Sequence, residues 1–358
     1  MNALACCYRP YYAIRITPFC RDRAMVSTCY NNTFRAENWL LIKNNIRQCW
    51  NSKKFQFQRK LLSKKNWGFC KGTHCYLNPI GNEAEFLEVE CVKNAIIEGK
   101  IKLDYFAKAL ELNIAYPCNN RCYFCFRSIK NNPYFLSEDL IKELKQEIIP
   151  LVDHVILSGG EPFFDKRSLE FIEWMVASYP QKRFSINTNG TLLHRFGLER
   201  LMKNNVYLVI TFYGMSSKTY KETTGSDNFH AVSDNSSKLI KAGYKRMQLC
   251  FLVCAESVGE IECFCDFVDK NQSVKAIIMN NRYDGKRYWK NMRLFENKFS
   301  HIASRLIFQY QSETLLEMAI RKLYNPMHSL RYLTEKWGEL IIDFKKRNAL
   351  KIIGKLME

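Results

Sequence analysis

The chain has 358 residues, of which 47% are hydrophobic, and it carries a formal net charge of +19. This length suits one large domain with smaller additions, and the apolar fraction is ample for a core. No run of 18 or more apolar residues occurs and no long apolar segment follows the N-terminus, so we expect neither a transmembrane helix nor a signal peptide.

The cysteines and the charges are both informative. Fifteen cysteines in a chain without a secretion signal favour metal or redox chemistry over a disulfide framework, and they predict a cytoplasmic location. Residues 1–110 carry 18 Lys and Arg against 8 Asp and Glu, and residues 39–82 contain nine basic residues and no carboxylate. This basic N-terminal lobe favours an anionic partner, such as nucleic acid, lipid headgroups or an acidic peptide, or else forms a solvated surface.

The N-terminal part is expected to contain a hairpin and a basic helix. Residues 11–16 read as a strand and residues 25–30 as its hairpin partner. Residues 46–62 have helical periodicity with Lys and Arg on one face, and the charged stretch 83–105 is expected to be a helical connector. Seven cysteines lie in the first eighty residues: Cys6, Cys7, Cys20, Cys29, Cys49, Cys70 and Cys75.

From Ala109 the pattern alternates between strands and helices. Strands are predicted at 109–116, 153–158, 183–188, 206–212, 246–254 and 274–280. Helices are predicted at 137–148, 167–178, 231–242 and 258–270. Repeats of this kind predict an α/β fold with a parallel sheet and right-handed crossovers, and six repeats favour a partial (β/α)6 TIM-like barrel. Chemistry in such barrels sits at the C-terminal ends of the strands.

Two amphipathic helices are expected after the barrel, at 300–323 and 329–356, where they would pack on it or lie on a membrane surface. The predicted domains are a small Cys-rich domain (1–82), the connector (83–108), the barrel core (109–284) and a helical C-terminal extension (285–358).

One loop concentrates the chemistry. Cys118, Cys122 and Cys125 follow the first predicted barrel strand in a C-x3-C-x2-C spacing. Three thiolates can hold three irons of a 4Fe–4S cluster and leave the fourth iron open to a small ligand. Zinc is the chemical alternative, but it would need a fourth ligand, and the loop contains no further His or Cys to supply one.

The spacing, with the aromatic Phe124 before the last cysteine, resembles the cluster loop of the radical S-adenosylmethionine (SAM) enzymes. Two later motifs fit the same family in order: Gly159-Gly160-Glu161-Pro162, and the stretch from Ser185 to Gly190. The resemblance implies that SAM chelates the open iron and that a flavodoxin or ferredoxin supplies an electron. Reduction would split SAM and generate a 5′-deoxyadenosyl radical, which abstracts hydrogen from the substrate.

The resemblance also implies roles for individual residues. Gly159, Gly160, Glu161 and Pro162 would meet the amino group of SAM. Ser185, Asn187 and Thr211 would reach its carboxylate and ribose, and Phe124 would lie near the adenine. Tyr213, Glu256 and Asp284 lie at or just past strand ends and could act on substrate, although the sequence does not select a catalytic residue among them.

The N-terminal cysteines resemble the ligands of the SPASM or twitch iron–sulfur domain of radical SAM maturases. Cys7, Cys29, Cys70 and Cys75 would then hold a second 4Fe–4S cluster, here N-terminal to the barrel where most relatives carry it C-terminally. Structural zinc or buried cysteines without metal are the alternatives.

The expected substrate is a peptide or another large molecule. This expectation follows from the SPASM-like cysteines. It also follows from residues 211–214 and 219–225, which resemble the stretch after the fourth strand in peptide-modifying maturases. The alternatives are an RNA- or carbohydrate-modifying radical SAM enzyme and, in a different class, a non-catalytic metal-binding adaptor.

Overall fold

The structure is a computed structural model that describes residues 9–20, 22–28, 39–64, 89–125, 135–203, 205–280, 295 and 297–309. The chain divides into two compact units, Met1–Gln311 and Ser312–Glu358, and all described residues lie in the first. The second unit, and with it the predicted helix at 329–356, lies outside the described residues.

A single ten-stranded sheet organises the first unit, in the order β10-β9-β8-β7-β6-β5-β4-β1-β2-β3. The strands are β1 (Ala13–Cys20), β2 (Arg23–Ser27), β3 (Trp39–Ile42), β4 (Ala109–Asn113), β5 (His154–Ser158), β6 (Arg183–Thr188), β7 (Val206–Phe212), β8 (Met247–Val253), β9 (Lys275–Asn280) and β10 (Leu306–Gln309). Neighbours from β1 and β4 through β10 are parallel, whereas β2 and β3 are antiparallel additions.

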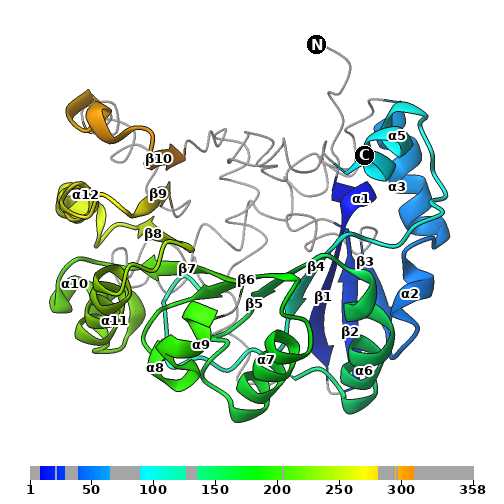
Figure 1. The fold of residues 1–358 in the computed structure, drawn as a ribbon, viewed down its shortest axis with the longest axis horizontal. Coiled ribbons are helices and arrows are strands. Elements are labelled where there is room, and N and C mark those ends of the chain that lie inside the picture. Colours follow the sequence, from blue (N-terminus) through cyan, green and yellow to red (C-terminus); the bar gives the residue numbers. More distant parts are fainter. Residues whose placement is uncertain are drawn as a thin grey trace, which may run out of the picture. The chain divides into compact units, whose positions relative to one another are not determined.

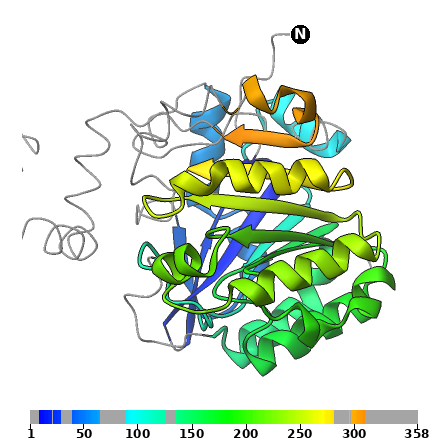
Figure 2. The same ribbon diagram turned by 90° about the vertical axis from the view of Figure 1, so that its left-hand side faces the viewer.

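The helices that connect the parallel strands lie on the outer face of the curved sheet (Figure 1). They are α6 (Glu138–Glu143), α7 (Lys166–Ser178), α8 (Leu193–Phe196), α9 (Leu198–Lys203), α10 (Ser217–Thr224), α11 (Phe229–Lys241) and α12 (Ile261–Lys270). A π-helical turn (Leu144–Ile148) and a 3-10 turn (Ile149–Leu151) extend α6, and a second 3-10 turn (Val258–Glu260) precedes α12. Figure 2 shows α11 and α12 running alongside the strands.

Burial alternates along β5, β6 and β7 because successive side chains point to opposite faces of the sheet. In β7, Val206, Leu208, Ile210 and Phe212 are buried, while the residues between them are partly exposed on the other face of the sheet, here called the concave face. Phe212 and Phe251 both contact Phe264 of α12, with ring centroids 6.0 and 4.9 Å apart. The outer face is therefore the hydrophobic core, and the concave face remains available for a site.

The six predicted barrel strands and the parallel sheet are confirmed, and the sheet contains two further parallel strands. β1 pairs with β4, and β10 pairs with β9. The expected helix at 300–323 is therefore wrong at its start, where a 3-10 turn (Ser300–Ile302) leads into strand β10. The run Leu306-Ile-Phe is equally compatible with a helix face or a buried strand, and pairing with β9 decides it.

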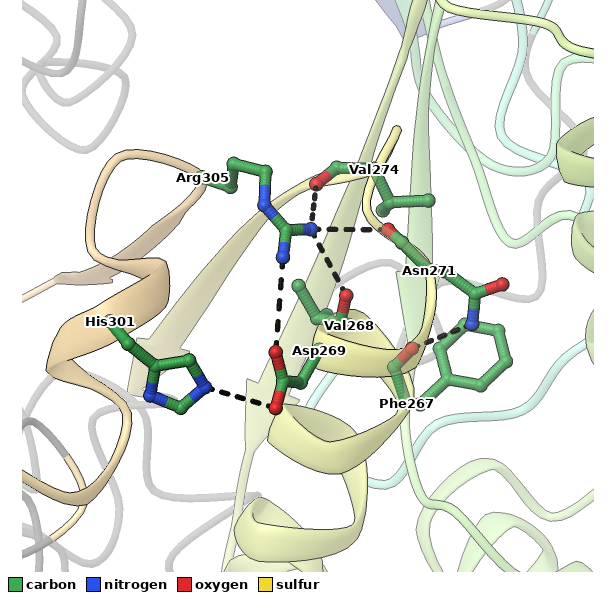
Figure 3. Close-up of polar contacts among 7 residues, drawn as sticks. All are labelled: Phe267, Val268, Asp269, Asn271, Val274, His301 and Arg305. Atoms are coloured by element: carbon green, nitrogen blue, oxygen red, sulfur yellow. Dashed lines mark hydrogen bonds and ion pairs between the residues drawn. The ribbon is translucent and has the colours of Figure 1, made fainter.

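Arg305 holds this added strand to the sheet edge (Figure 3). Its Nη1 donates to the carbonyls of Val268, Asn271 and Val274, at 3.1, 3.1 and 3.3 Å. These carbonyls belong to the end of α12 and the turn after it, where helix carbonyls lack partners of their own. His301 adds a 3.0 Å contact to Asp269 of the same helix.

The described N-terminal residues continue the barrel sheet. The predicted hairpin is confirmed, since β1 and β2 are antiparallel with Thr17 opposite Met25. The predicted helix at 46–62 is interrupted, giving α2 (Ile46–Cys49) and α3 (Lys53–Ser63), and Ser52 caps α3 by accepting a hydrogen bond from the Phe55 N–H. A short α1 (Arg9–Tyr12) precedes β1. No break in the sheet coincides with the predicted boundary at residue 82, and the four domains stay a prediction.

The connector is less helical than expected. Within residues 89–108 only α5 (Glu90–Ile97) is helical, and residues 98–108 form turns and extended chain that lead into β4. Gly99, with a φ of +63°, ends this helix in the left-handed conformation that favours glycine. Among the described helices, none has the length and apolarity needed to cross a membrane.

Arg59 of α3 is fully buried and joins three separate segments. Its guanidinium donates to the carbonyls of Pro10, Trp50 and Ile101, at 2.8, 2.7 and 3.0 Å, and to the Asn51 side chain. Burial lowers the pKa of Arg59 to about 10, which leaves it charged near neutral pH.

We expect Arg59→Met to destabilise the fold by about 3 kcal/mol or more, because several buried carbonyls would lose their donor. Urea unfolding followed by circular dichroism measures this difference. Lys60→Met, at the next and exposed position, is the control and should change the unfolding free energy by less than about 0.5 kcal/mol. Equal midpoints for the two variants would contradict this account of Arg59.

Candidate active site

The sequence motifs converge at one edge of the sheet. The three-cysteine loop follows β4, Gly159–Pro162 follows β5, and Asn189 and Gly190 follow β6. Because these strands are parallel neighbours, their C-terminal ends meet at the same edge. The predicted convergence of the motifs is therefore observed.

The glycines after β5 lie directly against the backbone that leads into the three-cysteine loop. A Cβ on Gly160 would lie 2.0 Å from the Pro117 carbonyl oxygen, and a Cβ on Gly159 would lie 2.6 Å from that of Ala115. The Gly160 N–H donates to Ala115 and the Glu161 N–H to Pro117, both at 3.0 Å. The close approach needs glycine at both positions, so the pair positions the three-cysteine loop whatever else it binds.

Glu161 connects the β5 loop to the end of β6. Its carboxylate is 3% exposed and accepts hydrogen bonds from the Thr188 hydroxyl and the Asn189 N–H, both at 2.7 Å. The Phe163 N–H donates a third, at 3.3 Å. Burial raises the pKa of Glu161 to about 7, although these hydrogen bonds act in the opposite direction.

This pKa predicts a pH dependence of stability. The folded state keeps a proton on Glu161 up to about pH 7, whereas the unfolded chain releases it near the ordinary value of 4.5. The unfolding free energy should therefore fall by about 3 kcal/mol as the pH rises from 4.5 to 7, and then level off.

Urea unfolding of the wild type and Glu161→Gln across this pH range tests the prediction. Glutamine carries no titrating proton, so the stability of the wild type relative to the variant should fall as the pH rises. Parallel pH profiles would show that Glu161 titrates at its ordinary value.

Side chains of the β6 turn hold the three-cysteine loop from one side. The Asn189 Nδ2 donates to the Asn119 Oδ1, and the Asn119 Nδ2 donates to the Thr191 hydroxyl, both at 2.8 Å. The Asn189 Oδ1 in turn accepts from the Thr191 N–H and hydroxyl. These contacts fix the loop immediately after Cys118.

Helix α10 and the turn after it hold the loop from the other side. The Arg121 N–H donates to the Thr224 carbonyl at 2.6 Å. The Asn120 side chain donates to the Tyr220 hydroxyl at 3.1 Å and accepts from the Ser226 hydroxyl at 2.6 Å. The loop is therefore held by hydrogen bonds from two neighbouring elements.

The sulfur atoms lie in surroundings that suit cluster ligands. Cys122 is buried, whereas Cys118 and Cys125 are half-buried. The Asn120 N–H and the Asn189 Nδ2 lie 3.4 and 3.9 Å from the Cys118 Sγ, as hydrogen-bond donors to it. Hydrogen bonds to ligand sulfurs are a recognised means of tuning iron–sulfur clusters.

Cys118 and Cys125 also lie close enough to Cys122 for their charges to affect its pKa. Burial, followed by the charges of Cys125 and Cys118, raises the pKa of Cys122 well above its ordinary value. A metal would bind this cysteine as the thiolate, so binding would release its proton. A further cysteine missed by sequence reasoning, Cys254 after β8, adds to the effect and hydrogen bonds with Thr223 and Ser257.

The chemistry of a three-cysteine ligand set suits an iron–sulfur cluster. Within the described ranges, no group of three or more His, Cys, Asp or Glu side chains is arranged to hold one metal ion. A structural zinc site needs four ligands converging on one centre, whereas a cluster binds each thiolate through a different iron. Cys118, Cys122 and Cys125 would hold the cluster.

The residues expected to contact SAM occupy different depths of the concave face. Asn187 is exposed near the end of β6, beside Val209 of β7. Ser185 lies deeper, and its hydroxyl hydrogen bonds with His154 Nε2 at 2.8 Å. Thr211 is half-buried beside Cys250 of β8, with which it hydrogen bonds. These placements leave Asn187 the most accessible, and the three assignments stay predictions.

Aromatic side chains pack together next to Cys125 of the three-cysteine loop. Phe124 lies beside Tyr213, with ring centroids 6.0 Å apart, and Tyr213 contacts Tyr220 at 5.9 Å. Burial and the nearby cysteines raise the pKa of Tyr213 well above its ordinary value. Glu256 accepts a 2.5 Å hydrogen bond from the Tyr123 hydroxyl. Of the residues suggested for substrate, Tyr213 and Glu256 thus contact the loop, while Asp284 lies outside the described residues.

Several further predictions cannot be placed. Cys7, Cys29, Cys70 and Cys75, the ligands suggested for a second cluster, all lie outside the described residues. By contrast, sequence reasoning missed Asn119, Asn120, Asn189 and Tyr220 as positioning residues. The two adjacent asparagines between Cys118 and Cys122 were the one feature of the sequence that could have indicated side-chain hydrogen bonds holding the loop.

Residues 112–268 match the family model described as the radical SAM superfamily. The probable GTP 3′,8-cyclase of Methanococcus aeolicus is 24% identical over 200 residues, which cover 54% of this chain and 67% of that protein. The GTP 3′,8-cyclase of Mannheimia succiniciproducens is 26% identical over 146 residues, or 39% of this chain and 43% of that protein. The chain spans between about half and two thirds of the first curated relatives it matches.

The chain also matches solved structures at low sequence identity. Streptococcus suis SuiB bound to S-adenosylmethionine is 16% identical with a TM-score of 0.48, and the match covers 83% of this chain and 73% of SuiB. Native anSMEcpe with bound AdoMet is 16% identical with a TM-score of 0.46, covering 56% of this chain and 64% of that one.

Proposed function

Because residues 112–268 match the radical SAM superfamily, we propose that the protein is an enzyme that cleaves SAM reductively at a 4Fe–4S cluster and abstracts hydrogen from a peptide. The observation that carries the proposal is the three-cysteine loop, held from both sides at the C-terminal ends of parallel strands with N–H donors directed at the Cys118 sulfur. Once reduced, the cluster and SAM together supply one-electron chemistry on an unactivated C–H bond. An electron donor such as flavodoxin or ferredoxin belongs to the same proposal.

The protein's own residues prepare this chemistry by holding the loop in place. Asn189, Glu161 and the β5 glycines join three strand ends, so the geometry is set before SAM arrives. Such positioning matters because misplacement by about 1 Å can cost about 100-fold in rate.

A peptide suits the described part of the concave face. Asn187 is exposed and Ser158 and Thr211 are half-buried near the C-terminal ends of β6, β5 and β7, so neutral amide and hydroxyl groups are accessible on neighbouring strands here. Such groups can donate to and accept from a peptide backbone. The positive charge of Arg9 on this side of the sheet is neutralised by an ion pair with Glu111, as a neutral peptide backbone would allow.

A nucleotide is the second candidate substrate, and the GTP 3′,8-cyclase relatives favour it. RNA and carbohydrate substrates remain alternatives on the same chemistry, and the basic N-terminal lobe is compatible with RNA.

Isotope transfer into 5′-deoxyadenosine distinguishes these substrates. Oxygen-free enzyme, unlabelled SAM and dithionite are incubated with uniformly deuterated pools of cellular peptides, nucleotides, RNA or carbohydrates, each in a separate reaction. The proposal predicts deuterium in 5′-deoxyadenosine with the peptide pool. Deuterium only from another pool would replace the peptide, and no 5′-deoxyadenosine in any reaction would favour the metal-binding adaptor.

A further inference from the structure

Helix α3 has a basic face directed away from the core. Phe55, Gln58, Arg59 and Leu62 are buried against the rest of the protein. The exposed residues Lys53, Phe57, Lys60 and Lys64 are spaced by four, three and four positions, which places them in one line along the opposite side. We call these four residues the lysine–phenylalanine stripe. From Lys53 to Lys64 it extends about 16 Å at the rise of an α-helix.

The charges of the stripe are uncompensated in the described part of the chain. No described carboxylate forms an ion pair with Lys53, Lys60 or Lys64, and residues 39–64 contain no Asp or Glu. By contrast, Lys43 pairs with Asp22 at 2.7 Å and Lys100 pairs with Glu98 at 3.0 Å. The three lysines therefore present a local positive field to solvent.

Phe57 adds an aromatic ring at the middle of this field. The residue is 58% exposed, more than Phe19 at 36% or Phe164 at 40%. An exposed ring between lysines combines the two groups that bind single-stranded nucleic acid, since the cations contact phosphates while a base stacks on the ring.

We propose that the lysine–phenylalanine stripe of α3 is a docking surface for single-stranded nucleic acid. Charge complementarity supplies the attraction, and Phe57 supplies a stacking platform that is independent of sequence. A membrane surface is disfavoured because an interfacial helix needs a continuous apolar face, and this stripe offers one ring. An acidic peptide would use the lysines and leave the ring without a planar partner. The inference rests on α3 alone and does not depend on the proposed radical chemistry.

Fluorescence anisotropy with a labelled 12-nucleotide oligouridine tests the proposal on the full chain. Three phosphate contacts predict a plot of log affinity against log salt with a slope of about −2. Lys60→Gln with Lys64→Gln should reduce the steepness of this slope by about 1.4. Phe57→Ala should weaken binding roughly 5- to 150-fold, whereas Phe57→Trp should retain it.

The matched control is Lys238→Gln with Lys241→Gln in α11. It removes the same charge from exposed positions in the last turn of another helix, and it should leave binding unchanged. Circular dichroism and melting of each variant confirm folding.

Three outcomes would overturn the proposal. In the first, the stripe variants bind the oligonucleotide as the wild type does. In the second, the α11 variant loses as much affinity as the lysine variant of the stripe. In the third, stripe-dependent binding is found only with phosphatidylglycerol vesicles, which would assign the surface to membranes. Oligouridine and oligothymidine are compared to separate RNA from single-stranded DNA.

Discussion

Replacing Cys122 by alanine is expected to remove the 4Fe–4S cluster from the candidate site and to reduce SAM cleavage below detection. Cys122 is the buried member of the trio, at the centre of a loop held by hydrogen bonds on both sides. With only two thiolates, two of the four irons would lack a protein ligand, and the cluster would not be held. Cys118→Ala and Cys125→Ala should have the same effect.

Iron and sulfide analysis of protein purified without oxygen measures the loss. The variant should contain about four fewer irons per chain than the wild type. Cys263→Ala is the matched control because Cys263 is an exposed cysteine on α12, and it should keep the wild-type iron content. Unchanged iron in Cys122→Ala would disprove the assignment of the ligands.

The same analysis bears on the second cluster. A wild-type total of about eight irons, falling to about four in Cys122→Ala, would support ligation by Cys7, Cys29, Cys70 and Cys75. A wild-type total of about four irons, falling to none in Cys122→Ala, would show that the N-terminal cysteines bind no cluster.

Gly160→Ala has the second largest expected effect. The added methyl group would lie 2.0 Å from the Pro117 carbonyl oxygen and 2.3 Å from that of Tyr116, so one of the two loops must move. Because backbone atoms make the contact, side-chain rotation offers no relief. We expect the rate of SAM cleavage to fall about 100-fold and the fold to lose about 1–3 kcal/mol, with the cluster retained.

Gly259→Ala is the control for this variant, since a Cβ at Gly259 has no atom within 4 Å. The two variants are compared by melting temperature, iron content and the rate of 5′-deoxyadenosine formation. If Gly160→Ala cleaves SAM as fast as Gly259→Ala, the close contact of the β5 glycines has no role in positioning the loop.

The parallel sheet could be predicted because its strands carry strong local signals. Strands such as β7 and β8 are short apolar runs separated by predicted helices, and polar motifs follow β4, β5 and β6. The place of the three-cysteine loop beside Gly160 then followed from the rule that parallel strands end at one edge.

The edges of the sheet and the contacts within the site could not be predicted in this way. Whether Leu306–Gln309 becomes a strand depends on pairing with β9, which is distant in the sequence. Asn189 and Tyr220 reach the three-cysteine loop across 70 and 100 positions of the chain, and spacing alone does not show which polar side chains meet.

The most direct test of the central claim is the formation of 5′-deoxyadenosine. Protein purified without oxygen is mixed with SAM and dithionite, and the products are separated by chromatography. The account predicts 5′-deoxyadenosine and methionine from the wild type and neither above background from Cys122→Ala. Wild-type protein that contains its irons and still leaves SAM intact would contradict the account.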